Sequence, residues 1–204
     1  MKIALVHDDL MRRGGAEKVA LAFHKIYPEA PIYTLCYQPD LTYPEFKEAN
    51  VITSEYQKYV SDEDKMKKFF YPFGYLAMRR LKIQGYDKVL LSSTYASKYA
   101  NFDKQTEIIN YIHNPFRIAW YPESYDSYNE KTGIKKALYN RVLKNIRKLD
   151  YRHTRKADKI IVNSLVVKQR VKEIYGREAD ALINPPVDLS DFSNIPDTTK
   201  GDYY

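Results

Sequence analysis

The chain has 204 residues, and its 33 Lys and Arg side chains against 26 Asp and Glu give a formal net charge of +7. Hydrophobic residues make up 44% and charged residues 29%, an ordinary globular composition that excludes collagen-like, disordered and coiled-coil proteins. A single cysteine, Cys36, rules out an intramolecular disulfide and suits a reducing compartment. Neither a signal-peptide core nor the ~20 apolar residues of a membrane-spanning helix is visible, so we expect a cytoplasmic protein.

Short apolar runs alternate with amphipathic segments along the chain. The runs typical of buried strands are 2–6, 32–36, 51–53, 87–92, 107–113, 159–163 and 179–183. A helix is predicted after the first run, ending near Pro28, and another between a Ser164 cap and Gly176. The alternation predicts an α/β fold with a Rossmann-like, doubly wound and mostly parallel sheet. We expect one domain over residues 1–188, followed by a linker-like composition over 189–204.

Two segments hold the excess positive charge. Residues 65–82 contain six cations and no carboxylate, and residues 131–156 contain ten cations against Asp150 alone. Localised cationic patches of this kind point to anionic partners. In the second segment, one apolar stripe indicates a long helix whose other faces are cationic, and a solvated cationic face needs no ligand. The stripe consists of Ile134, Leu138, Val142, Ile146 and Leu149.

The first basic segment mixes its cations with aromatic side chains, as expected for a surface that rests on an anionic membrane. An ordinary surface helix with snorkelling lysines explains the pattern equally well, and Pro72 and Gly74 interrupt any continuous helix. Nucleic-acid binding has no recognised motif to support it. The predicted membrane-contact residues are Lys65, Lys67, Lys68, Phe69, Phe70, Arg79 and Arg80.

Ligands of open parallel sheets bind beyond the carboxyl ends of the strands, so the residues after each predicted strand are the candidates for a site. His113 ends a strand just before Pro115, which favours a binding or catalytic imidazole at the sheet edge. Gly14 and Gly15 precede a helix and allow a close approach to an anion, although their spacing matches no nucleotide fingerprint. The other histidines are weaker candidates, and His153 lies among cations that disfavour its protonation. No metal-ligand spacing and no nucleophile elbow is present.

The segments that carry these loops resemble a known family. KIALVHDDLMRRGGAEKV, YDKVLLSSTYASKYA, INYIHNPFRIAWYPESY and ADKIIVNSLVVKQRVKEIYGREADALINPPVD are similar, in this order, to the N-terminal domain of retaining GT-B glycosyltransferases of family 4. The similarity is greatest to mannosyltransferase-like bacterial enzymes of surface polysaccharide assembly. The resemblance implies two Rossmann-like domains that face a cleft, of which this chain is the N-terminal, acceptor-side half. Residues 189–204 would then lead into a truncated C-terminal domain.

The resemblance also implies roles for individual residues. Gly14 and Gly15 would approach the donor diphosphate, and His113 would hydrogen-bond the transferred sugar during configuration-retaining transfer. Asp8, Lys98 and Arg117 lie in matching segments and would bind acceptor hydroxyls or phosphate.

The implied reaction is transfer of a hexose from a nucleotide-sugar, such as GDP-mannose or a UDP-hexose, to a saccharide or polyprenyl-linked acceptor, without a cofactor or metal. Because the residues that bind the donor lie in the missing C-terminal domain, this chain alone is expected to be inactive. If the acceptor is lipid-linked, the enzyme is expected at the inner face of the cell membrane. The alternative is a non-catalytic α/β domain that docks on a membrane or a partner through residues 65–82. Nucleic acid is not an expected partner.

Overall fold

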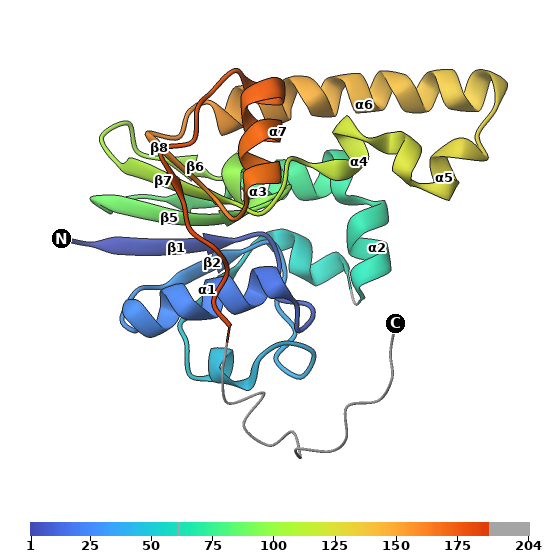
Figure 1. The fold of residues 1–204 in the computed structure, drawn as a ribbon. Helices are drawn as coiled ribbons and strands as arrows, with labels where there is room; N and C mark the ends of the chain where they lie inside the picture. The colour runs from blue at the N-terminus through green and yellow to red at the C-terminus, as the bar shows by residue number, and fades with distance from the viewer. Residues whose placement is uncertain (61, 188–204) are drawn as a thin grey trace, which may run out of the picture.

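The structure, a computed structural model, describes residues 1–60 and 62–187, so the predicted linker and second-domain start at 189–204 lie outside the described residues. A seven-stranded sheet forms the centre of the molecule, in the order β3-β2-β1-β5-β7-β8-β9, and every pairing in it is parallel (Figure 1). The predicted α/β class and Rossmann-like parallel sheet are confirmed.

All seven predicted apolar runs are strands of this sheet. Their bounds are β1 Ile3–His7, β2 Ile32–Thr34, β3 Val51–Thr53, β5 Lys88–Ser93, β7 Glu107–Ile112, β8 Lys159–Val162 and β9 Ala181–Leu182. Two further strands, β4 Lys82–Ile83 and β6 Asn101–Phe102, pair in a separate parallel ribbon that the sequence pattern did not predict. From β1 the chain winds outward to β3 and then returns to β5, so the strand order reverses between β1 and β5. This switch point is where open α/β sheets bind ligands.

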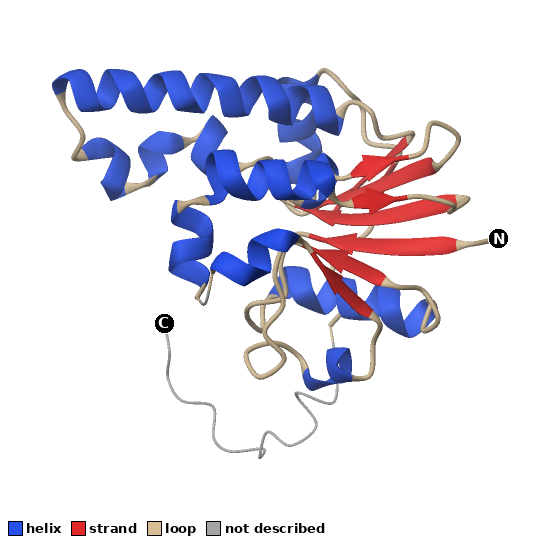
Figure 2. Cartoon of the chain, turned by 180° about the vertical axis from the view of Figure 1, so that it is seen from behind, coloured by secondary structure: helices blue, strands red, loops and turns tan. Residues whose placement is uncertain are grey.

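Helices cover both faces of the sheet, as Figures 1 and 2 show. The helices are α1 Gly15–Ile26, α2 Glu63–Lys68, α3 Tyr75–Arg80, α4 Arg117–Trp120, α5 Asp126–Asn129, α6 Gly133–Thr154 and α7 Leu165–Tyr175. Successive residues of β1 point to opposite faces: Leu5 packs with α1, whereas Ala4 and Val6 pack in the cluster that contains Met78 of α3. Burial on both faces explains why the strands are continuous apolar runs.

The predicted boundaries of α7 are confirmed by its caps. The Ser164 side chain accepts a hydrogen bond from the Val167 backbone N–H at 3.3 Å, which satisfies one of the unpaired donors of the first turn. At the other end Gly176 has φ 60°, a left-handed conformation that costs a glycine little. Both caps could be read from the sequence because they depend only on local chemistry.

The predicted long basic helix exists as α6, and its apolar stripe is only partly buried. Ile146 is buried, whereas Ile134 and Leu138 are 88% and 64% exposed. The reason is the length of the helix: its N-terminal half runs past the strands, over α4 and α5, where no sheet remains to cover it (Figure 1). Periodicity predicted an amphipathic helix correctly without specifying which part of it has a partner.

The first basic segment forms α2 and α3, which are separated by the irregular turn Phe70–Gly74, as Pro72 and Gly74 predicted. Met66, Phe70 and Met78 are buried in the core from this segment. The prediction that Phe70 contacts a membrane is therefore wrong, because its ring packs edge-to-face on Tyr95 with ring centroids 4.9 Å apart.

A buried ion pair ties the helices on one face together. Lys98 Nζ lies 2.6 Å from Asp150 Oδ1, and both side chains are almost fully buried. Asp150 also accepts hydrogen bonds from Trp120 Nε1 at 2.7 Å and from the Tyr175 hydroxyl at 2.6 Å. Because these partners belong to α4, α6, α7 and the turn after β5, Asp150 connects four segments that are distant in sequence.

Candidate functional site

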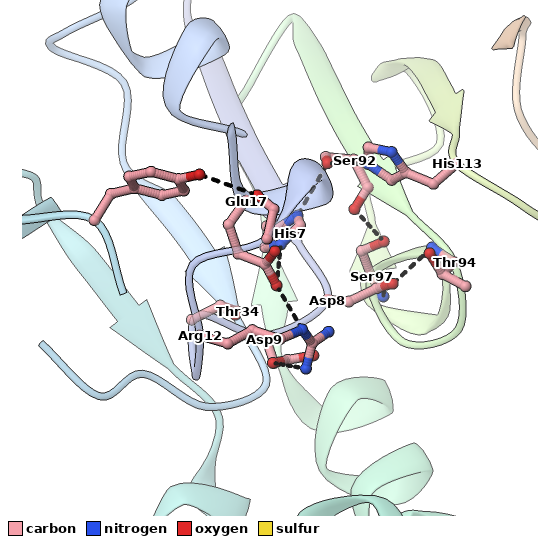
Figure 3. Close-up of polar contacts among 12 residues, drawn as sticks. His7, Asp8, Asp9, Arg12, Glu17, Thr34, Ser92, Thr94, Ser97 and His113 are labelled. Atoms are coloured by element: carbon pink, nitrogen blue, oxygen red, sulfur yellow. Dashed lines mark hydrogen bonds and ion pairs between the residues drawn. The ribbon is translucent and has the colours of Figure 1, made fainter. Parts of the chain in front are cut away.

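The residues that follow β1, β5 and β7 meet at the switch point of the sheet (Figure 3). His7 and Ser92 are register partners on adjacent strands, and His113 directly follows β7 on the other side of β5. The His7 and His113 rings are 6.4 Å apart between centroids. A cavity of about 430 Å³ opens beside them, and its wall includes His7, Asp8 and Glu17. The structure thus brings together polar residues from the ends of three strands.

Asp8 is held entirely by backbone N–H groups of the turn after β5. Its Oδ2 accepts from Thr94 at 2.6 Å and Tyr95 at 3.0 Å, and its Oδ1 accepts from Ala96 at 2.9 Å and Ser97 at 2.7 Å. Burial opposes its ionisation, but the charge of His7 and these N–H groups outweigh burial and lower the pKa of Asp8. A carboxylate offers about four lone-pair sites, and all are used. The expectation that Asp8 binds acceptor hydroxyls is therefore corrected: Asp8 fixes the 94–97 turn.

Ser92 bridges the two imidazoles. Its Oγ lies 2.9 Å from His7 Nδ1 and 2.7 Å from His113 Nε2, so one hydroxyl serves both rings. Burial disfavours the charged imidazole of His7, yet the neighbouring Glu17, Asp8 and Asp9 carboxylates outweigh burial and raise the pKa of His7. Burial, followed by the charge of His7, lowers the pKa of His113 to about 4.

These opposite pKa shifts favour one direction of the hydrogen bonds. The raised pKa of His7 favours its protonated form, whose Nδ1–H donates to Ser92 Oγ, and the Ser92 hydroxyl then donates to Nε2 of neutral His113. The proton of His113 consequently resides on Nδ1. No described side chain accepts from that nitrogen, so the Nδ1–H of His113 remains a donor at the end of β7.

The start of α1 is organised around Glu17. Its Oε1 lies 3.8 Å from His7 Nε2 and 3.3 Å from Arg12 Nε, which are ion pairs within a largely buried cluster. Burial opposes its charge, but His7 and Arg12 lower the pKa of Glu17. A Cβ on Gly14 would lie 2.4 Å from Glu17 Oε2, whereas a Cβ on Gly15 would meet no atom within 4 Å. A side chain at position 14 would therefore require the Glu17 carboxylate to move.

Asp9 is a third carboxylate in contact with this cluster. It is fully buried, accepts from the Tyr95 hydroxyl at 2.7 Å and lies 3.4 Å from Arg12 Nη1. Burial is the largest influence and raises the pKa of Asp9. Arg12 also pairs with Glu63 of α2, so one guanidinium connects the loop after β1, the start of α1 and the basic segment.

The cavity wall combines aromatic rings with charged groups. Phe70, Tyr95, Phe116 and Tyr125 contribute rings, and Arg12, Lys67 and Arg117 contribute cations. Arg117 is exposed at the first position of α4, and its guanidinium lies 5.8 Å from the Tyr125 ring centroid. Apolar rings with a few placed polar groups are typical of small-molecule sites. Arg12 and Lys67 are ion-paired with carboxylates, so Arg117 is the cation of this wall that is suited to a phosphate.

Not every residue predicted for the site lies there. Lys98 is paired with Asp150 in the core, so the expectation that it binds the acceptor is corrected: its charge is consumed by a buried carboxylate. His113 touches Ser92 but does not line the cavity. Arg79 is half-buried and lines a different cavity, whereas Lys65, Lys67, Lys68, Phe69 and Arg80 are exposed.

Sequence reasoning underrated four residues of this site, namely His7, Arg12, Glu17 and Ser92. The signal for His7 and Ser92 was present, because both lie at the carboxyl end of a predicted strand. Arg12 and Glu17 flank the glycine pair, but no spacing rule shows that their side chains turn inward.

Replacing Ser92 with alanine is expected to break the bridge between the imidazoles and to cost about 1–3 kcal/mol of unfolding free energy. His113 should also lose its preference for the Nδ1–H tautomer, because no hydroxyl then donates to Nε2. Long-range ¹H–¹⁵N NMR at pH 7 reports the tautomer directly. Ser93→Ala is the matched control, because Ser93 Oγ donates to Asn110 Oδ1 at 2.7 Å and touches neither ring. Protonated Nε2 in the parent protein would contradict the assignment.

Among residues 1–60 and 62–187, no group of three or more His, Cys, Asp or Glu side chains is arranged to hold a metal ion. Within the same ranges, no helix has both the length and the apolar character needed to cross a bilayer. Comparisons of the sequence with models of known protein families and with curated proteins find no match.

Proposed function

We propose that this chain is the acceptor-side half of a retaining glycosyltransferase, which transfers a hexose from a nucleotide-sugar to a saccharide or lipid-linked acceptor. The observation that carries the proposal is the cavity at the β1–β5 switch point, where aromatic rings and cations lie beside His7, whose ring Ser92 bridges to His113. This supports the function implied by the four segments that resemble family 4 glycosyltransferases.

The cavity suits a sugar that carries phosphate. The Tyr95, Phe116 and Tyr125 rings provide flat apolar surface, and Arg117, which forms no ion pair with a described residue, is a donor suited to phosphate oxygens. In the proposed complex these groups bind the acceptor, and Gly14 and Gly15 lie where the donor diphosphate approaches.

His113 has the proposed catalytic role. With Nε2 held by Ser92, its Nδ1–H is the free donor for a hydroxyl of the transferred sugar. The donor nucleotide, GDP or UDP, is assigned to a second domain that closes over the strand ends. The exposed apolar residues Leu165 and Val166, in the first turn of α7, support a contact surface there, since both follow Asn163, whose Nδ2 donates to the His113 carbonyl. No metal is assigned to the reaction.

A second function is favoured by a separate surface. Tyr59, Phe69, Phe73 and Leu76 are between 45% and 81% exposed and line a groove of about 570 Å³ beside Arg80. Exposed aromatic residues next to Lys65, Lys67 and Lys68 suit an anionic membrane surface. The chain could therefore act as a peripheral, non-catalytic membrane-binding domain, or the groove could hold the glycosyltransferase at the inner membrane face where lipid-linked acceptors occur.

The proposed function predicts that a protein in which this chain is joined to a second α/β domain transfers hexose. Radiolabelled GDP-mannose and UDP-hexoses are offered with saccharide and polyprenyl-linked acceptors, and NMR of the product shows whether the anomeric configuration is retained. His113→Ala should lower kcat/KM by about 10- to 100-fold, because one hydrogen bond to the transferred sugar is lost. The matched imidazole control is His24→Gln, since His24 packs on Phe46 away from the cavity.

Liposome sedimentation separates the two candidate functions. In one outcome the protein binds anionic vesicles, Phe69→Ser/Phe73→Ser does not, and no hexose is transferred to any acceptor. That outcome would support the membrane-binding function and exclude the glycosyltransferase. Transfer that is unchanged in His113→Ala would overturn the assignment of the catalytic residue.

A further inference from the structure

A second polar cavity lies at the opposite end of the sheet from the strand ends described above. Its volume is about 250 Å³, and its wall includes Thr106 and Asp158, which immediately precede β7 and β8. The C-terminal end of α6 and the end of α3 complete the wall with His153 and Arg79. The cavity is therefore at the amino ends of the strands, separate from the switch-point site.

Unpaired cations dominate this cavity. Arg79, Lys104 and Lys156 line it, and none of them forms an ion pair with a residue in the described part of the chain. Its two carboxylates are already engaged by backbone donors: Asp103 Oδ2 accepts from Gly85 N–H at 2.7 Å, and Asp158 Oδ2 accepts from Ile108 N–H at 2.8 Å. These hydrogen bonds leave both carboxylates charged, but the three cations without an ion pair outnumber them, so the net charge of the cavity is positive and favours an anion.

His153 provides an independent indication of a ligand. Its side chain is only 7% exposed, and it packs edge-to-face on Tyr99 and Tyr75 with ring centroids 5.2 and 6.3 Å away. Neither ring nitrogen has a hydrogen-bond partner among the described residues, and neither is sealed from solvent, so the ring presents a free nitrogen to the cavity that it lines. Burial, followed by the charges of Lys156, Arg79, Arg152 and Lys98, lowers the pKa of His153 to about 4. A neutral imidazole with an unpartnered nitrogen thus opens onto a cavity lined by cations.

We propose that this cavity binds a small phosphate-bearing anion, with His153, Arg79 and Lys156 as its donors. The volume is below the ~300–1,000 Å³ of sites for larger organic ligands, which restricts the ligand to inorganic phosphate or a compact phosphate monoester. Arginine and a neutral imidazole N–H can donate to separate phosphate oxygens, and the lysines neutralise the charge. The cavity assigns a role to Arg79 that the membrane interpretation of the basic segment did not foresee.

The test measures the binding of inorganic phosphate and of glucose 6-phosphate by calorimetry, with chloride holding the ionic strength constant. Saturable 1:1 binding of either compound is expected. Tighter binding of glucose 6-phosphate indicates an organic monoester as the ligand, and equal or tighter binding of phosphate indicates the free ion. NMR titration gives a second readout: the pKa of His153 should rise from about 4 when a dianion is bound. The fit of the His153 titration curve must include the other charged and titratable groups around the ring. They are Lys98, Asp103, Lys104, Lys156, Asp158, Arg79, Arg152, Tyr75 and Tyr99.

Arg79→Gln/Lys156→Gln should weaken phosphate binding by about tenfold or more, since two charge-assisted donors are lost. Lys144→Gln/Lys148→Gln removes the same charge from exposed positions of α6 outside the cavity and should change affinity less than about twofold. Should the first variant fail to fold, Lys104→Gln changes an exposed residue of the cavity rim and should still weaken binding. Equal weakening in the α6 control, or a His153 pKa that phosphate leaves unchanged, would overturn the proposal.

Discussion

Asp150→Leu is expected to lower the free energy of unfolding by about 3–5 kcal/mol, because it leaves the buried charge of Lys98 without its carboxylate. The Thr154 hydroxyl, 3.4 Å from Lys98 Nζ, and the Tyr175 ring, whose centroid is 5.9 Å away, then remain near that ammonium, and neither carries a negative charge. Trp120 and Tyr175 lose their acceptor at the same time. Because the free energy of unfolding of a domain is only about 5–15 kcal/mol, this loss brings the protein close to unfolding. Urea denaturation followed by far-ultraviolet circular dichroism measures it.

The two partners of this ion pair should not be equivalent. Lys98→Met leaves Asp150 with its neutral donors, so its cost is expected to be smaller than that of Asp150→Leu. Lys98→Met/Asp150→Leu should be more stable than Asp150→Leu alone, because no unpaired charge remains in the core. Lys172→Met is the control, since its ion pair with Glu178 is exposed and such pairs are worth about 0–1 kcal/mol. A double variant no more stable than Asp150→Leu would contradict the account.

Acid is expected to destabilise the fold well above the pKa values of ordinary carboxylates. His113 and His153 have their pKa values lowered to about 4, so both are neutral in the folded protein at pH 5, whereas unfolded histidines take up protons below about pH 6.5. Stability is therefore lost as the pH falls from about 6.5 toward 4, by about 2 kcal/mol for each ring between pH 7 and pH 5. Denaturation at pH 7, 6 and 5 in phosphate-free buffers measures this loss.

The raised pKa of His7 acts in the opposite direction, because its stabilisation is present at low pH and is lost as the pH rises through its folded pKa. Single variants separate these contributions. His153→Gln should make the loss between pH 7 and pH 5 smaller by about 2 kcal/mol, whatever its effect at pH 7. Because His113 and His153 lie at opposite ends of the sheet, His113→Gln/His153→Gln should remove both contributions additively. An unchanged pH dependence in His153→Gln would show that folding does not lower the pKa of His153.

The sequence alone was sufficient for the sheet and for the edge that carries the candidate site. Strands buried on both faces must be apolar throughout, so each apolar run identified a strand, and the polar residues after β1, β5 and β7 marked one rim. The Ser164 and Gly176 caps were equally predictable, since their hydrogen bonds and backbone conformation are local.

Tertiary structure decided which of the polar and amphipathic residues face a partner. The polar and charged residues around Phe70 and Lys98 in the sequence suggest that both lie at the surface. Both are buried, because Tyr95 and Asp150, from other parts of the chain, pack against them. Conversely, Ile134 and Leu138 continue a regular apolar stripe into solvent, since α6 is longer than the sheet it covers.

The candidate site divides in the same way. Sequence placed His7, Asp8 and His113 at strand ends, but only packing showed that Asp8 is used up by four backbone donors and that Ser92 joins the two rings. The alternation of apolar and polar residues indicates which side of a segment is exposed to water, and this is a local property. The charge state and hydrogen-bond partners of a buried side chain depend on groups brought together from distant parts of the chain, and those are fixed only when the helices pack on the sheet.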